Sequence, residues 1–283
     1  MGKIVGYLRL MRPVNCLMVG FAVVVGAVIV SPNISNALWL NLSYSFVTGF
    51  ALTAEAMIIN DYYDREIDAI NEPGRPIPSG LVYPHEALVL AFALTVIGLT
   101  AAYLAYPSSL AIAIFAWIVF VIYTTIGKRS GLPGNFLVSI CVAIPFIFGS
   151  YTAVSSIEPN VMIVSIIAFL SNTGREITKG IVDVEGDRAK NIRTVAVRYG
   201  EKAAAVVAVL FFLSAILLSP IPLVLNFVSL WFIPLAAMTD FGLGVSSFML
   251  LKDHSRENAR KVKKIILLSF LVALLAFVAG AAK

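Results

Sequence analysis

Apolar stretches long enough to cross a bilayer recur along the whole of this 283-residue chain. Each holds about 18 to 22 residues, and about 20 apolar residues in an α-helix span the hydrocarbon core of a membrane. Charged residues make up 13% of the chain, whereas about 25% is usual in a soluble domain. The sequence therefore predicts an all-α polytopic membrane protein. The net charge of +5 comes from basic residues next to these stretches, which favours contact with anionic lipid over nucleic acid.

The apolar stretches predict about nine transmembrane helices, in one transmembrane domain that covers 1–283. Prolines mark short turns on one side of the membrane, and the connections on the other side are longer and charged. We expect the spans near 13–30, 37–59, 86–105, 109–126, 135–154, 161–180, 202–219, 222–250 and 264–281.

The basic residues predict the orientation of these spans. All of the 21 Lys and Arg residues except Lys283 fall on the side that holds the N-terminus and the charged connections. Cytoplasmic connections carry an excess of Lys and Arg. We therefore expect a multi-pass protein of the cell membrane with its N-terminus in the cytoplasm and its C-terminus outside, which requires an odd number of spans.

Residues 60–68, NDYYDREID, place four acids directly after an apolar stretch. At about 100° per residue, the polar side chains that share one arc of the helix are Asn60, Asp61, Asp64 and Asp68. Arg65 lies beside this arc, and Glu66 points elsewhere. The carboxylates would oppose the dipole at the C-terminal end of a helix, so the pattern favours a bound cation if the helix continues through it.

A second acidic segment, REITKGIVDVEGD, covers 175–187. One helical face would carry Arg175, Glu176, Lys179, Asp183 and Asp187, whereas Glu185 points away from it. An even number of crossings separates the two acidic segments, so both must lie on the same side of the membrane. A charged helix end is commonly only a solvated face, but two such ends with the same Asp–x–x–x–Asp spacing favour a shared binding site.

Oxygen ligands of this kind suit Mg²⁺, which takes one or two carboxylates and completes its shell with water and phosphate. Neither histidine lies in a pattern typical of zinc. Mg²⁺ between the two segments would bind a diphosphate, and Lys179, Arg175 and Arg65 would supply further positive charge. The amphiphile carrying that diphosphate would lie among the apolar spans.

These motifs resemble the UbiA superfamily of intramembrane prenyltransferases. NDYYDREID matches the first family motif at Asn60, Asp61, Asp64 and Asp68, and KGIVDVEGD matches the second at Lys179, Asp183 and Asp187. GRPIPSG at 74–80 resembles the loop after the first motif. YTTIGKR at 123–129 resembles a tyrosine-and-lysine motif, with Tyr123, Lys128 and Arg129, and Asn15 matches a polar position of the first helix.

Within that superfamily the motifs are most similar to those of archaeal digeranylgeranylglyceryl phosphate synthases. The resemblance implies helices around a central cavity open to the cytoplasmic side, with Mg²⁺ on Asp61, Asp64, Asp68, Asp183 and Asp187. It implies transfer of a geranylgeranyl group from geranylgeranyl diphosphate to the free hydroxyl of geranylgeranylglyceryl phosphate. This reaction would form the diether core of an archaeal membrane lipid and release diphosphate.

The acceptor phosphate would need cations of its own. The candidates on the correct side are Arg9, Arg12, Arg75, Lys128 and Arg129. No general base for the hydroxyl is evident, and the acids inside the spans, Glu55 and Asp240, have no assigned role. We expect substrates and membrane lipids as partners, with no nucleic acid and no obligate protein partner.

Three other functions fit parts of the pattern. The chain could prenylate an aromatic acceptor in quinone or related biosynthesis, which needs no acceptor phosphate. It could be a transporter, although transporters place ionisable residues near the bilayer midplane. It could be purely structural, although two matched acidic faces argue against that.

Overall fold

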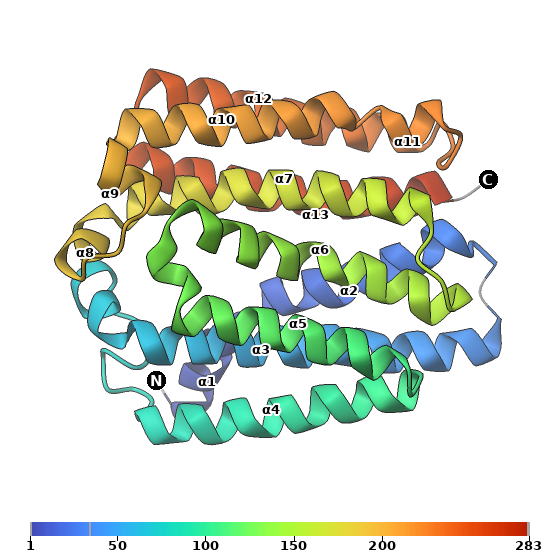
Figure 1. Ribbon diagram of the computed structural model, residues 1–283, viewed down its shortest axis with the longest axis horizontal. Coiled ribbons are helices and arrows are strands. Elements are labelled where there is room, and N and C mark those ends of the chain that lie inside the picture. The colour runs from blue at the N-terminus through green and yellow to red at the C-terminus, as the bar shows by residue number, and fades with distance from the viewer. Residues whose placement is uncertain (1, 34, 282–283) are drawn as a thin grey trace.

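A computed structural model describes residues 2–33 and 35–281, and the described chain is a bundle of helices without strands (Figure 1). The helices are α1 Lys3–Met11, α2 Pro13–Val30, α3 Asn36–Asn71, α4 Pro84–Ala105, α5 Ser109–Thr125, α6 Leu132–Val154, α7 Pro159–Val182, α8 Val184–Ala189, α9 Val195–Tyr199, α10 Glu201–Leu218, α11 Ile221–Val224, α12 Phe232–Lys252 and α13 Arg256–Ala281. One 3₁₀ turn, η1, covers Gly127–Ser130. Prolines at the first position of α2, α4 and α7 suit helix starts, where no backbone N–H is needed.

Within the described residues, eight helical segments are long and apolar enough to cross a membrane, and α5 is a shorter apolar helix. The prediction of an all-α multi-pass membrane protein is therefore confirmed, whereas the count of nine spans stays a prediction. Large apolar side chains face outward along the bundle, among them Phe92, Leu217 and Phe241, each more than 70% exposed. Lipid would cover such surfaces, which are rare on soluble monomers.

Two segments differ from their expected bounds. α3 continues unbroken to Asn71, so the whole first acidic segment lies on one helix as the motif geometry requires. The span expected at 222–250 begins later, at Phe232, because α11 ends in a turn in which Asn226 adopts the left-handed conformation.

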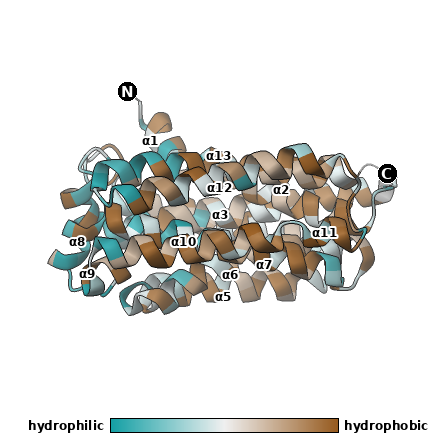
Figure 2. Cartoon of the chain, turned by 90° about the horizontal axis from the view of Figure 1, so that it is seen from above, coloured by the Kyte–Doolittle hydropathy of each residue, from teal (hydrophilic) through white to brown (hydrophobic). Residues whose placement is uncertain are grey.

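Hydrophilic residues gather at one end of the bundle, where α8 and α9 lie, whereas the walls of the bundle are mostly hydrophobic (Figure 2). α1 lies at this end, and the C-terminal end of α13 lies at the opposite end (Figure 1). This arrangement agrees with termini on opposite sides of a membrane. We call the first of these ends the polar end.

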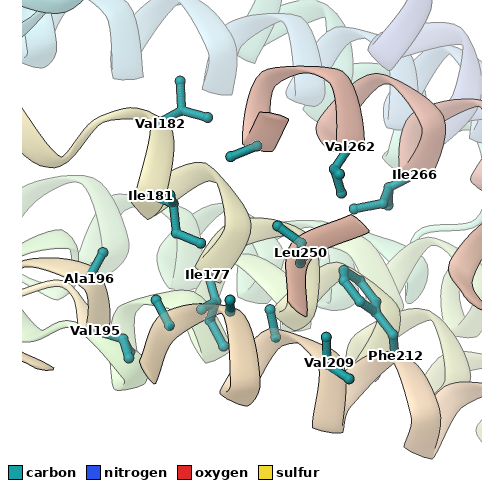
Figure 3. Close-up of a cluster of buried hydrophobic side chains, with 14 of the residues drawn as sticks. Ile177, Ile181, Val182, Val195, Ala196, Val209, Phe212, Leu250, Val262 and Ile266 are labelled. Atoms are coloured by element: carbon teal, nitrogen blue, oxygen red, sulfur yellow. The ribbon is translucent and has the colours of Figure 1, made fainter. Parts of the chain in front are cut away.

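Close packing positions the helices that line the site. α2 packs between α3, α6, α7 and α13, and a Cβ at Gly149 of α6 would clash with the backbone of α2 at Val23. Small residues of this kind let membrane helices approach closely. At the polar end, Ile177 and Ile181 of α7 pack against Phe212 of α10 and Ile266 of α13 (Figure 3). This cluster fixes the part of α7 that carries the second acidic segment.

Candidate active site

Three aspartates are buried on one face of α3 near its end, namely Asp61, Asp64 and Asp68. Asn60, one turn before Asp64, donates a hydrogen bond of 2.8 Å to its Oδ2. The face predicted from helical spacing is therefore the buried one.

Each of these carboxylates is paired with a cation from another segment. Arg12, between α1 and α2, contacts Asp61 at 2.5 Å. Arg75, in the loop after α3, contacts Asp61 at 3.2 Å and Asp68 at 2.5 Å. Lys128 of η1 pairs with Asp64. Removing one partner of a buried pair typically costs about 3–5 kcal/mol, because the other charge stays buried.

The second acidic segment lies on a broken helix. α7 ends at Val182, and α8 starts at Val184, so Asp183 stands at the junction. Asp183 is half-buried and Asp187 is buried. Burial, together with the nearby charge of Asp183, raises the pKa of Asp187 to about 7. A positive charge placed between these carboxylates would relieve both effects.

Asn71 holds the two acidic segments together. Its Nδ2 donates to the carbonyl of Asp183 at 3.3 Å, and its Oδ1 accepts from the backbone N–H of Gly186 at 3.1 Å. A Cβ at Gly186 would clash with the Asn71 side chain. Motif matching did not identify Asn71, although it follows the last motif aspartate by one turn and is buried where α3 ends.

The start of the second acidic segment, on α7, holds an ion-pair group around buried Glu176. Glu176 accepts from Arg175 at 2.9 Å and pairs with Lys179 at 3.5 Å. Tyr123 of α5 is buried within reach of the charges of Lys179 and Asp64. The structure thus brings these predicted site residues to the same place as the aspartates.

Two predicted residues lie outside this group. Arg65 donates to the carbonyl of Tyr62 at 2.8 Å, and its guanidinium lies 4.8 Å from the centre of the Tyr62 ring. Arg129 is exposed. The structure therefore does not bring either side chain to the aspartates, because Arg65 is engaged by Tyr62 and Arg129 lies at the surface of η1.

Two cavities begin among the charged side chains at the polar end. One, of about 230 Å³, runs between α3 and α5 and is lined by Ala113, Trp117 and Phe120; we call it the α5 cavity. The other, of about 200 Å³, runs to α12 and is lined by Phe232, Ala236 and Leu243; we call it the α12 cavity. Both are mainly apolar. The polar residues common to both linings are Asn15, Thr53, Arg175 and Glu176.

The two acids inside the spans lie deeper, one in each cavity. Glu55 is buried and lines the α5 cavity. Asp240 lines the α12 cavity and accepts a hydrogen bond of 2.5 Å from Ser219. Neither residue lies at the charged end that the cavities share, so the structure adds no role for them.

The carboxylates fit a divalent cation that is shared with a substrate. Among the described residues, no group of three or more Asp, Glu, His or Cys side chains is placed to hold a metal ion alone. Mg²⁺ commonly takes one or two carboxylates and completes its shell with phosphate and water. At the α7–α8 junction, half-buried Asp183 and buried Asp187 form no direct ion pair with a described residue, and Lys128 and Lys179 act on Asp187 only from further away. These two aspartates match that requirement.

Known proteins share this sequence and this fold. The chain is 37% identical to a digeranylgeranylglyceryl phosphate synthase of Archaeoglobus fulgidus, over 96% of this chain and 94% of that protein. A solved structure, described as digeranylgeranylglyceryl phosphate synthase in membranes, is 31% identical with a TM-score of 0.74, over 99% of both chains. The structure of a UbiA homologue from Archaeoglobus fulgidus bound to DMAPP and Mg²⁺ has a TM-score of 0.70 at 15% identity, over 95% of this chain and 99% of that chain.

The family expected from the motifs is confirmed over nearly the whole chain. The model of the UbiA prenyltransferase family matches residues 18–280. This range contains both acidic segments and most residues that line the two cavities. The chain therefore belongs to the UbiA prenyltransferase family and is an intramembrane prenyltransferase.

Proposed function

We propose that this enzyme transfers a geranylgeranyl group from geranylgeranyl diphosphate to the free hydroxyl of geranylgeranylglyceryl phosphate. The observation that carries the proposal is the pair of apolar cavities with a common charged end. Two lipid substrates with charged headgroups would each place an apolar chain in one cavity and meet where the cavities join. The names of the relatives agree with this reaction.

The aspartates and the surrounding cations would both neutralise charge on the donor diphosphate. Asp61, Asp64, Asp68, Asp183 and Asp187 would hold Mg²⁺, which would neutralise charge on the departing diphosphate. Arg75 and Lys179 line the α5 cavity at its charged end, where they would add fixed positive charge. We therefore place the donor chain in the α5 cavity, with Asn60 beside its diphosphate.

The remaining steps concern the acceptor. The allylic C–O bond would break with its electron pair going to diphosphate, and the acceptor oxygen would form the new C–O bond. Glu176 would take the hydroxyl proton, because it is the acid that lines both cavities in the described chain. The apolar walls would keep water from the allylic cation.

The orientation of the enzyme is part of the proposal. The polar end carries the basic connections and α1, so we place the aspartates and the N-terminus in the cytoplasm and the C-terminus outside. Soluble diphosphate would then leave directly into the cytoplasm. Cysteines introduced at exposed Arg129 and at exposed Ser108, in the turn between α4 and α5, should react with an impermeant maleimide from opposite sides of sealed vesicles.

Purified enzyme in detergent tests the reaction directly. It would receive labelled geranylgeranyl diphosphate, Mg²⁺ and either geranylgeranylglyceryl phosphate or 4-hydroxybenzoate. We expect a diether product from the lipid acceptor and no product without Mg²⁺. Preferential prenylation of the aromatic acid would contradict the proposal and would support the quinone-type alternative. In that alternative the acceptor has no isoprenoid chain to occupy the α12 cavity.

A further inference from the structure

The first helix, α1, presents an apolar face to the outside of the protein. The exposed side chains of this face are Ile4, Val5 and Leu8, and Ile4 is 73% exposed. The opposite side of the helix packs on the bundle through buried Gly6 and Leu10. At about 100° per residue, the exposed apolar side chains share one arc that points directly away from Gly6 and Leu10. A protein surrounded by water would bury such a face.

α1 stands beside the bundle near its polar end rather than within it (Figure 2). It packs on α3 and α2. Leu10 belongs to one buried cluster with Val82, just before α4, and with Ala87 in its first turn, and a Cβ at Gly6 would clash with Val82. These contacts hold the packed side of α1 against α3 and the start of α4. The apolar face therefore points away from the bundle at the level of the polar end.

Two exposed cations, Lys3 and Arg9, border the apolar face on its two edges. Lys3 pairs with Glu86 of α4 at 2.5 Å. Arg9 donates to the carbonyl of Gly74 at 3.1 Å and forms no ion pair with any residue that the structure describes. Long basic side chains at the rim of an apolar face keep their charge among headgroups while the helix buries its apolar side. This arrangement is typical of an amphipathic helix that lies in a membrane interface.

We propose that α1 docks on the bilayer surface at the polar end and that its partner there is a layer of anionic lipid headgroups. The apolar face would enter the boundary between headgroups and acyl chains, and Arg9 would contact a lipid phosphate. The exposed apolar surface resumes at Val14 and Leu17 of α2, directly after α1, so lipid already covers the neighbouring wall. This docking does not depend on which acceptor the enzyme uses.

Docking of α1 would also position a residue of the active site. Arg12 joins α1 to α2 in the left-handed conformation, with a φ of 52°, which is uncommon for a residue other than glycine. Its backbone N–H donates to the carbonyl of Leu8 at 3.2 Å, and its guanidinium contacts Asp61. The turn thus ties the direction of α1 to the place that the Arg12 side chain reaches. A bilayer that holds α1 would hold Arg12 on Asp61.

The depth of α1 in the membrane tests the docking directly. The protein, with its native cysteines replaced by alanine, would carry a nitroxide label at Ile4→Cys or Leu8→Cys in nanodiscs of phosphatidylglycerol and phosphatidylcholine. Reference labels would stand at Phe92→Cys, on the lipid-facing side of α4, and at Ala189→Cys, exposed at the end of α8. Collision rates with oxygen and with a water-soluble nickel chelate report the depth. We expect both α1 labels to lie between the references, and a nickel collision rate equal to that at Ala189 would overturn the docking.

Two further measurements identify what covers the face. In nanodiscs of phosphatidylcholine alone, the labels at Ile4 and Leu8 should show a nickel collision rate at least about twofold higher, because a neutral surface does not attract the basic rim. An equal rate in both lipids would exclude anionic headgroups as the partner. A disulfide between two chains through Ile4→Cys would show that a second copy covers the face, and this result would also overturn the proposal.

The link to Arg12 is tested with Ile4→Ser/Leu8→Ser and with the matched control Ile4→Leu/Leu8→Ile, which keeps the face apolar. In anionic nanodiscs we expect the rate of prenyl transfer by the serine variant to fall about three- to tenfold, with the control unchanged. In the Arg12→Gln background the serine substitutions should have no further effect, because the contact with Asp61 is already lost. Melting temperatures would check the folding of each variant. A serine variant as active as the wild type, or a full second loss in the Arg12→Gln background, would overturn the link.

Discussion

The two acidic segments balance their charge in different ways. On α3, the carboxylates of Asp61, Asp64 and Asp68 all have cationic partners from other segments. At the α7–α8 junction, the side chains of Asp183 and Asp187 form no ion pair with any described residue, and burial raises the pKa of Asp187. The first segment is thus also part of the structural framework, whereas the carboxylates of Asp183 and Asp187 have only more distant cations, such as Lys128 and Lys179, around them. We infer that a bound cation matters most to the second segment.

The largest effect should follow from a change that damages both framework and chemistry. Asp61→Asn would remove the carboxylate that Arg12 and Arg75 share. We expect kcat/KM to fall by about a thousandfold. We also expect the free energy of unfolding in detergent to fall by about 3–5 kcal/mol. Activity assays and thermal denaturation would measure both. Unchanged stability would show that the α3 ion pairs are not structural and would remove the contrast between the segments.

Asp187→Asn should separate chemistry from stability. We expect activity to fall by about a hundred- to a thousandfold, with a melting temperature equal to or above that of the metal-free wild type, because one of two like charges at a buried position is lost. Mg²⁺ with diphosphate should stabilise the wild type more than this variant. A variant that melts far below the wild type would mean that Asp187 has a structural partner.

Glu176 belongs to the second segment and lines both cavities, so it tests the proton transfer. Glu176→Gln keeps the shape of the side chain but cannot take a proton, so we expect kcat to fall by about a hundredfold with the donor KM nearly unchanged. Glu176→Asp should retain more activity than the glutamine variant. An unchanged kcat would exclude Glu176 as the proton acceptor.

Asn71 connects the segments and should have a moderate effect. Asn71→Ala would remove two hydrogen bonds between α3 and the α7–α8 junction. We expect a loss of stability of about 1–3 kcal/mol and a rise in the Mg²⁺ concentration needed for half-maximal activity. A normal Mg²⁺ requirement would show that the segments keep their spacing without this contact.

The smallest effects should come from the two cations that lie outside the site. Arg65→Gln and Arg129→Gln should each change kcat/KM by less than about threefold, since neither half-buried Arg65 nor exposed Arg129 pairs with an aspartate of the site, and charges near the surface typically contribute about 0–1 kcal/mol. Steady-state assays would decide. A loss as large as that of Asp187→Asn would return Arg65 or Arg129 to the catalytic group.

Helical periodicity identified the part of the site that lies on a continuous helix. Asn60, Asp61, Asp64 and Asp68 share the buried face of α3 because α3 continues through them without a break. Helical periodicity predicted the second segment less well, because the helix stops at Asp183 and restarts as α8. It also placed Arg65 near the site, whereas a local contact with Tyr62 holds this side chain outside.

Residues that reach the site from distant segments could not be identified by spacing. Arg12 stands between α1 and α2 and Lys128 lies on η1, and only the packing of these segments against α3 brings Arg12 to Asp61 and Lys128 to Asp64. The paired cavities depend on the same packing. The sequence therefore predicts the membrane fold and the carboxylates, but not which cation neutralises which acid.

The most direct test is a double-mutant cycle on the binding of diphosphate with Mg²⁺. Calorimetry would give the affinities of the wild type, Asp64→Asn, Asp187→Asn and the double variant, each with and without Mg²⁺. If both helix ends bind the same cation-bridged ligand, binding should require Mg²⁺ and the two substitutions should couple by more than about 1 kcal/mol. Additive losses, or equal binding without Mg²⁺, would contradict a site shared by the two acidic segments.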